Sequence, residues 1–225
     1  MKLVTILLSI FVLALPAFAV ETKDTLTESN VVVDRTECDT SGCDYTGMEV
    51  NEEFDATGGP LRYGPVGTAS GCSILDVILS VNIDQTWCGD LVIDLYYDVD
   101  SDGIMDLGPV SALCRPALDG CAYDGCCGCS GDVFGIYTFS DNGGAPLGET
   151  DCPSQIPTGC YLPAIESPAG FAATFGGAAS GGDFYMEIAD GAGGDSTFLF
   201  DWGVYVCCGS TASENTDWSE VKITY

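Results

Sequence analysis

Residues Phe198–Val206 read FLFDWGVYV, and their apolar and polar residues alternate more cleanly than any other stretch of the chain. Successive side chains of a β-strand point to opposite faces, so a period of two marks a strand with one face buried. The solvent side of this strand would carry Asp201, Gly203 and Tyr205. The inward set predicted by the pattern is Phe198, Phe200, Trp202, Val204 and Val206.

Four earlier runs have the same character, and together they predict an all-β chain. They are Ile74–Ile83, Leu91–Tyr97, Val133–Phe139 and Asp183–Ile188. Clusters of Gly, Asn and Asp between the runs supply the positive-φ turns that hairpins require. The 29 glycines disfavour helices, and no helical periodicity follows the N-terminal region. We expect an all-β, disulfide-rich jelly-roll β-sandwich.

The N-terminus has the layout of a secretory signal peptide. Lys2 precedes the apolar run Leu3–Leu15, and Ala17–Ala19 is a small-x-small cleavage site. The run is shorter than the roughly 20 residues of a membrane span, although an N-terminal anchor helix is the alternative. We predict a signal peptide at 1–19, an acidic extension at 20–60, the sandwich at 61–206 and a C-terminal tail at 207–225. The protein would be secreted and extracellular, without membrane insertion after cleavage.

The chain is strongly acidic, which restricts its partners. Its 34 Asp and Glu residues outnumber six Lys and Arg, for a formal net charge of −28. Such a surface repels nucleic acid phosphates and anionic membranes. The expected partners are cations, chiefly calcium, or basic protein surfaces. Solubility in a salty medium explains the same charge equally well.

Cysteine density indicates a disulfide framework, because the chain is predicted to be exported. A zinc cluster is the alternative, but the chain has no histidine and no paired CxxC knuckles. Cys38 and Cys43 are expected to fix the acidic extension, with a bond to each other as one option. The odd count leaves one thiol over. The 13 cysteines are Cys38, Cys43, Cys72, Cys88, Cys114, Cys121, Cys126, Cys127, Cys129, Cys152, Cys160, Cys207 and Cys208.

The same lack of histidine argues against catalysis. A Ser–His–Asp triad or a Cys–His pair needs an imidazole as its base. No pair of carboxylates stands out as an aspartic-type catalytic site. We therefore expect the chain not to be an enzyme.

The segment Asp98–Asp106, with the sequence DVDSDGIMD, is the first candidate for a calcium site. Carboxylates at the first, third, fifth and ninth positions and Gly at the sixth match the start of a calcium loop. Pro109 stands where an EF-hand has its bidentate Glu. The alternative is a solvated acidic hairpin tip. The predicted ligands are Asp98, Asp100, Asp102, the carbonyl of Ile104, and Asp106.

A second-choice metal group consists of Asp190 and Asp195, joined by Asp141. The alternative, which we favour, is that these acids accept hydrogen bonds from turn amides. Trp87 and Trp202 are interpreted as core aromatics rather than ligand platforms.

The run VNIDQTWCGDLVIDL at Val81–Leu95 is similar to the pattern VxIxHTWRGDLVIxL, and four later blocks extend the similarity in order. They are Tyr137–Asp141, Thr158–Pro163, Phe175–Gly177 with Gly182–Asp190, and Gly194–Asp195 with Phe200–Val204. Together they resemble the P domain (P/Homo B domain) of subtilisin/kexin-like proprotein convertases. The resemblance covers some two thirds of the chain that follows the signal peptide. It implies a jelly-roll sandwich of galactose-binding-like type.

Three departures limit what the resemblance implies. The family's histidine and arginine are Gln85 and Cys88 here, so the interactions of those side chains are not carried over. Residues 98–130 replace a simpler hairpin, and no subtilisin-like catalytic domain precedes the blocks. A label of serine-type endopeptidase would belong to the full-length proteases.

The leading hypothesis is a stand-alone, non-catalytic module that binds calcium and acts through protein contact. Its partner would be a subtilisin-like serine endopeptidase or copies of itself. The alternatives are a matrix or assembly protein cross-linked by disulfides, and a carbohydrate-binding β-sandwich.

Overall fold

The computed structural model describes residues 37–55, 59–116, 128–148, 152–194 and 196–209. Nearly all of the regular structure in these ranges is β. The elements are β1 (Cys43–Phe54), β2 (Leu61–Gly67), β3 (Ser73–Gln85), the 3-10 turn η2 (Cys88–Asp90), β4 (Leu91–Asp98), β5 (Leu107–Cys114), β6 (Asp132–Phe139), β7 (Gln155–Ile156), β8 (Gly159–Tyr161), the helix α1 (Gly170–Phe175), β9 (Asp183–Asp190) and β10 (Thr197–Gly209).

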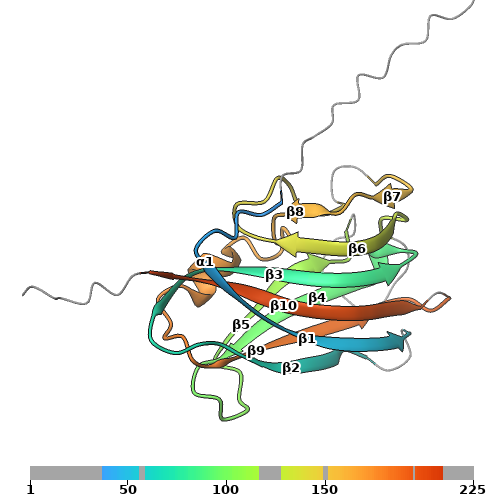
Figure 1. Cartoon of the computed structure of the whole chain (residues 1–225). Coiled ribbons are helices and arrows are strands. Elements are labelled where there is room, and N and C mark those ends of the chain that lie inside the picture. Colours follow the sequence, from blue (N-terminus) through green and yellow to red (C-terminus); the bar gives the residue numbers. More distant parts are fainter. Residues whose placement is uncertain (1–36, 56–58, 117–127, 149–151, 195, 210–225) are drawn as a thin grey trace, which may run out of the picture. The chain divides into compact units, whose positions relative to one another are not determined.

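Two sheets lie face to face (Figure 1). One has six strands in the order β1-β10-β3-β6-β7, with β8 also paired to β6. The other has four strands in the order β2-β9-β4-β5. All pairs are antiparallel except β6 with β7 and β6 with β8, which are parallel. The predicted all-β sandwich is confirmed.

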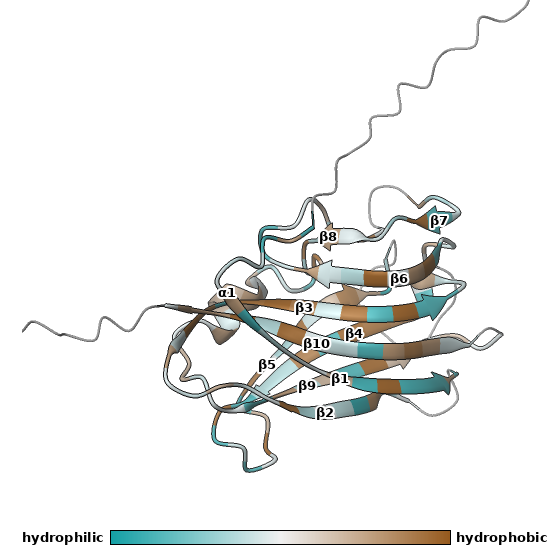
Figure 2. Ribbon diagram, in the orientation of Figure 1, coloured by the Kyte–Doolittle hydropathy of each residue, from teal (hydrophilic) through white to brown (hydrophobic). Residues whose placement is uncertain are grey.

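The core lies between the sheets, where the alternating faces meet. Brown and teal segments succeed one another along the strands in Figure 2, as a sandwich requires. The inward faces of β3 and β9 are those that the sequence predicted. Residues at most 2% exposed include Val77, Leu79, Val81, Ile83, Ile93, Leu95, Tyr97, Phe184, Met186, Ile188, Trp202 and Val204.

The inward face predicted for β10 is wrong at its N-terminal end. Leu199 is 0% exposed, whereas Phe198 and Phe200 are half-buried. The register of β10 against β3 shifts between Leu199 and Asp201, so Phe200 is an extra residue in a β-bulge. A bulge reverses the alternation along its strand. Trp202, beyond the bulge, is fully buried, as predicted.

β4 is buried on both faces, which its alternating sequence did not indicate. Val92 is 1% exposed, and Asp94 is 9% exposed with its Oδ1 accepting a 2.6 Å hydrogen bond from the Ser111 hydroxyl. The backbone N–H of Ala164 donates to the Ser111 carbonyl, so the segment after β8 packs alongside β5.

β1 belongs to the sandwich, although its residues fall in the predicted acidic extension. It pairs with β10 from Cys43 opposite Cys207 to Phe54 opposite Thr197. β10 likewise runs to Gly209, into the predicted tail. β1 carries few apolar residues because it is an edge strand, and its alternation is correspondingly weak.

Four disulfides join described cysteines, and Cys114 is also disulfide-bonded. The bond considered between Cys38 and Cys43 is wrong, because each bonds to a distant strand. Cys88 is 0% exposed, and Cys121, Cys126 and Cys127 lie outside the described residues. The pairs are Cys38–Cys160, Cys43–Cys207, Cys72–Cys208 and Cys129–Cys152. Bonds of this kind form in oxidising compartments, as expected of an extracellular protein.

Sequence reasoning predicted no helix, but the six-residue α1 is present. It is too short for helical periodicity to be recognised. Within the described residues, no helix is long and apolar enough to cross a membrane.

Candidate functional site: the acidic loop between β4 and β5

The hairpin of β4 and β5 holds the first-choice calcium segment. The N–H of Asp106 donates to the carbonyl of Tyr97 over 3.1 Å and closes the loop. Ser101 and Gly103 have φ values of 58° and 88°, in the left-handed region. Glycine reaches that region at no steric cost, which explains Gly at the sixth position of the segment.

Asp98 organises the loop from its base. It is 0% exposed, and its Oδ1 and Oδ2 accept hydrogen bonds from the N–H groups of Asp102 (3.2 Å) and Gly103 (2.7 Å). At the other end, Asp106 Oδ2 accepts from the N–H of Val99 over 2.8 Å. The backbone amides thus orient both carboxylates.

Three of the predicted ligands converge. One carboxylate oxygen from each of Asp98, Asp100 and Asp106 lies within 4.8 Å of the other two. Asp102 is not in this group; its Oδ1 accepts from the N–H of Ile104 over 2.8 Å. The side chain of Ile104 is 67% exposed.

The convergence has an electrostatic cost. The pKa of Asp100 is raised above its usual value, first by the negative charge of Asp102, then by desolvation and by the charges of Asp106 and Asp98. Like charges disfavour ionisation, and a bound cation reverses this effect. Three carboxylates supply part of the six to eight oxygens that calcium takes, and carbonyls or water would complete the set.

The second-choice acids lie in different surroundings. Asp141 accepts hydrogen bonds at the start of α1, from the N–H groups of Phe171 (2.9 Å) and Ala172 (2.7 Å). Asp190 is 5% exposed and accepts from the Gln85 amide at 3.3 Å. Asp195 lies outside the described residues, so the trio as a metal site stays a prediction.

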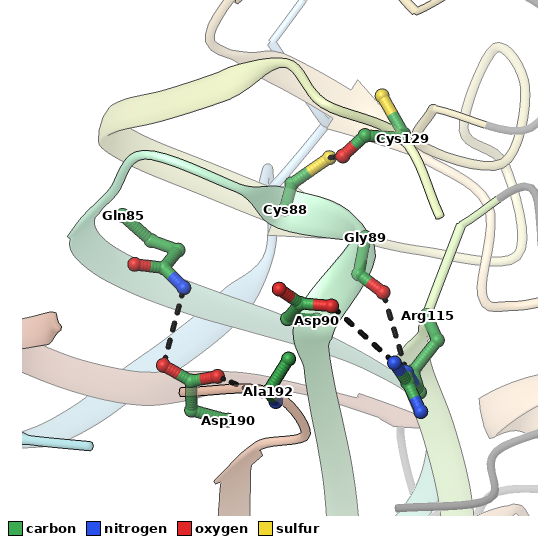
Figure 3. Close-up of polar contacts among 8 residues, drawn as sticks. All are labelled: Gln85, Cys88, Gly89, Asp90, Arg115, Cys129, Asp190 and Ala192. Carbon is green, nitrogen blue, oxygen red and sulfur yellow. Dashed lines mark hydrogen bonds and ion pairs between the residues drawn. The ribbon is translucent and has the colours of Figure 1, made fainter. Parts of the chain in front are cut away.

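A buried polar cluster lies beside η2 (Figure 3). Gln85 donates to Asp190, whose Oδ1 accepts from the Ala192 N–H. Cys88 places its Sγ 3.7 Å from the carbonyl oxygen of Cys129.

Arg115 is the member of this cluster that sequence reasoning missed. Its side chain is 1% exposed, donates to the Gly89 carbonyl at 3.3 Å, and pairs with Asp90 at 3.3 Å. The sequence feature that could have identified Arg115 is its positive charge, because it is one of only six basic residues in a very acidic chain. It also directly follows Cys114. A buried cation of this kind needs a carboxylate partner.

The comparisons with known proteins add little to this geometry. No protein-family model and no curated protein matches the chain. Among solved structures, it is similar to a serine protease of Aeromonas sobria, with a TM-score of 0.37 and 12% identity over 74% of this chain. It is also similar to an Aeromonas sobria serine protease in complex with the chaperone, with a TM-score of 0.36 and 12% identity over 72%.

The chain spans 26% of the length of each of these solved chains. At such TM-scores the likeness establishes neither a common fold nor a common activity.

Proposed function

We propose that the chain is a secreted, non-catalytic P-domain-like module that binds calcium at the β4–β5 loop. It acts through contact with another protein, for which a subtilisin-like serine endopeptidase is the first candidate. The observation that carries this proposal is the convergence of Asp98, Asp100 and Asp106 on one point of the loop. Calcium favours such clusters of hard oxygen ligands.

The placement of the five sequence blocks supports the resemblance to P domains. Val81–Leu95 runs through β3, η2 and β4, and the later blocks fall at the end of β6, on β8, on β9 and on β10. The blocks that carry the resemblance therefore lie on successive elements of one sandwich. The absence of histidine from the whole sequence supports a non-catalytic role.

Thermal unfolding tests the calcium site. The melting temperature of the secreted protein is measured with calcium, with magnesium and with a chelator. We expect calcium to raise it, because an ion that binds only the folded state stabilises that state by mass action. Magnesium should have less effect, because it demands a near-octahedral arrangement. Equal melting temperatures in all three buffers would refute a folding-linked calcium site.

Size-exclusion chromatography tests the partner. The protein is run in calcium alone and after mixing with a subtilisin-like serine endopeptidase. Co-elution of the two supports the proposed contact. Separate elution, together with multimers of the chain that dissociate only under reduction, would instead favour the cross-linked matrix protein.

A further inference from the structure

The outer face of the six-stranded sheet carries a hollow of about 660 Å³, which the acidic loop does not share. It lies over β1, β10, β3 and β6 and is lined by Tyr45, Tyr205, Asp201, Ser80, Ile136 and Thr138, among others. Its size falls within the range of small-molecule sites. Tyr45 and Ile136 are 52% and 54% exposed, so large apolar groups face the solvent here.

The ring of Tyr45 lies on a floor of two glycines. A Cβ at Gly47 would stand 2.5 Å from the Tyr45 hydroxyl oxygen, and one at Gly203 would stand 2.6 Å from it. Neither glycine has a positive φ. A Cβ would also stand 2.7 Å from the Trp202 carbonyl oxygen at Gly47 and 2.5 Å from the Thr46 carbonyl oxygen at Gly203, so the close approach of the ring and of the neighbouring strand together explains both glycines. Tyr205 flanks the ring with a centroid distance of 4.8 Å. The floor keeps an aromatic surface open to the hollow.

Polar groups of fixed orientation surround this aromatic surface. Asn82 donates from Nδ2 to Asp201 Oδ2 over 2.8 Å, which fixes the carboxylate on the sheet. Desolvation, then the charges of Asp201 and Tyr205, raise the pKa of Tyr45, so its hydroxyl remains a donor. The described lining residues include the acids Glu37 and Asp201 and no basic side chain. This lining disfavours an anionic ligand.

A second hollow of about 590 Å³ continues the same face, because the bulge in β10 turns Phe198 and Phe200 outward. Their ring centroids are 4.6 Å apart, and Asp84 and Glu53 lie beside them. From Tyr205 to Phe198 the strand covers about 24 Å, at about 3.4 Å a residue. The two hollows suit an extended ligand better than a compact one.

We propose that this face binds a neutral, linear oligosaccharide. Sugar rings offer C–H faces that pack on the negative faces of aromatic rings, and hydroxyls that both donate to carboxylates and accept from amides. A peptide fits less well, because the backbone groups of β10 and β3 are already paired within the sheet and would leave those of the peptide unsatisfied.

Isothermal titration calorimetry of the secreted protein tests this proposal, with cellohexaose, mannohexaose and chitohexaose as probes. Hexalysine is titrated as well, because a basic peptide is the alternative ligand for an acidic face. We expect at least one hexasaccharide to bind, with its affinity reduced about tenfold or more by Tyr45→Ala and by the isosteric Asp201→Asn. Tyr185→Ala is the matched control, because Tyr185 also lies over a glycine, Gly64, but on the other sheet. The Tyr185→Ala variant should bind the hexasaccharide with the affinity of the unsubstituted protein.

Three outcomes would overturn the proposal. They are no binding of any hexasaccharide, saccharide binding that survives both Tyr45→Ala and Asp201→Asn, and salt-sensitive binding of hexalysine alone. Melting temperatures of the variants show that each is folded, and chelator in the buffer keeps the result independent of the β4–β5 loop.

Discussion

Asp100 carries the electrostatic strain of the β4–β5 loop, because its pKa is raised by the neighbouring acids. A carboxyl with a raised folded-state pKa adds stability below its unfolded pKa, and that contribution is lost as the pH rises through the folded value. For Asp100 the loss begins near pH 4, the usual range of Asp. Without calcium, the charged loop therefore opposes folding at neutral pH.

Asp100→Asn should consequently have opposite effects with and without the ion. In chelator we expect a higher melting temperature than in the unsubstituted protein at pH 7, and little difference at pH 3. In calcium we expect a smaller rise than the unsubstituted protein shows, because one ligand is weakened. Glu166→Gln, in an exposed turn, is the control. A lower melting temperature in chelator would contradict the electrostatic argument.

The Asp90–Arg115 pair differs in burial from the chain's other described ion pair, Arg62–Glu187. Arg115→Met would remove the guanidinium that pairs with the buried Asp90 carboxylate, and we expect a loss of about 3–5 kcal/mol in the free energy of unfolding. Arg62→Met should cost about 1 kcal/mol or less, because the Arg62 side chain is 47% exposed. Urea denaturation measures both, and equal losses would contradict the role given to burial.

At the residue scale, only local patterns could be predicted from sequence. The spacing of the acids identified the loop, since hairpin geometry brings Asp98 and Asp106 together within nine positions. The surroundings of Arg115 and Tyr45 depend on strands far away in the chain, and no local spacing encodes them.

At the scale of the element, the β10 bulge decides which residues the strand buries. Leu199 occupies the core position that alternation alone assigns to its neighbours. Inserted residues of this kind leave no mark in the sequence, because the alternation before and after them is regular. β1 could be predicted only in part: Met48–Val50 suggests a short strand, but the length of β1 depends on its pairing with β10 and on its disulfide, while Met48, Val50 and Phe54 pack against the core.

Two alanine substitutions on β10 test whether Leu199 faces the core, as observed, or whether Phe198 does, as strict alternation predicts. Leu199→Ala should lower the free energy of unfolding by about 2–5 kcal/mol, as expected for a fully buried leucine. Phe198→Ala should cost clearly less, because its ring is half-buried on the outer face. Chemical denaturation of both variants checks the order. A larger loss for Phe198→Ala than for Leu199→Ala would contradict the bulge and favour strict alternation.

At the scale of the whole molecule, disulfides connect parts that the sequence separates. Three of those described span 122, 164 and 136 residues, and the fourth spans 23. The sandwich itself could be predicted, because a period of two recurs along the chain. The pairing could not, because every cysteine has many possible partners and only the folded sheet brings Cys43 opposite Cys207.

Replacing Cys43 and Cys207 together by Ser should lower the free energy of unfolding by about 2–5 kcal/mol. The bond restrains β1, an edge strand, against β10, so hydrogen exchange should also quicken in β1 before the rest of the sheet. Mass spectrometry of peptides from β1 and from β3 provides the comparison. Uniform quickening in both strands would contradict a restraint confined to the edge.

The pairing of β1 with β10 also limits the order in which the sheet can form during synthesis. β1 is the first and β10 the last of the strands that the structure describes, so the backbone of β1 finds its partner only after β10 has been made. A chain interrupted before Thr197 would lack the central strand between β1 and β3. The six-stranded sheet therefore closes only once Thr197–Gly209 is available.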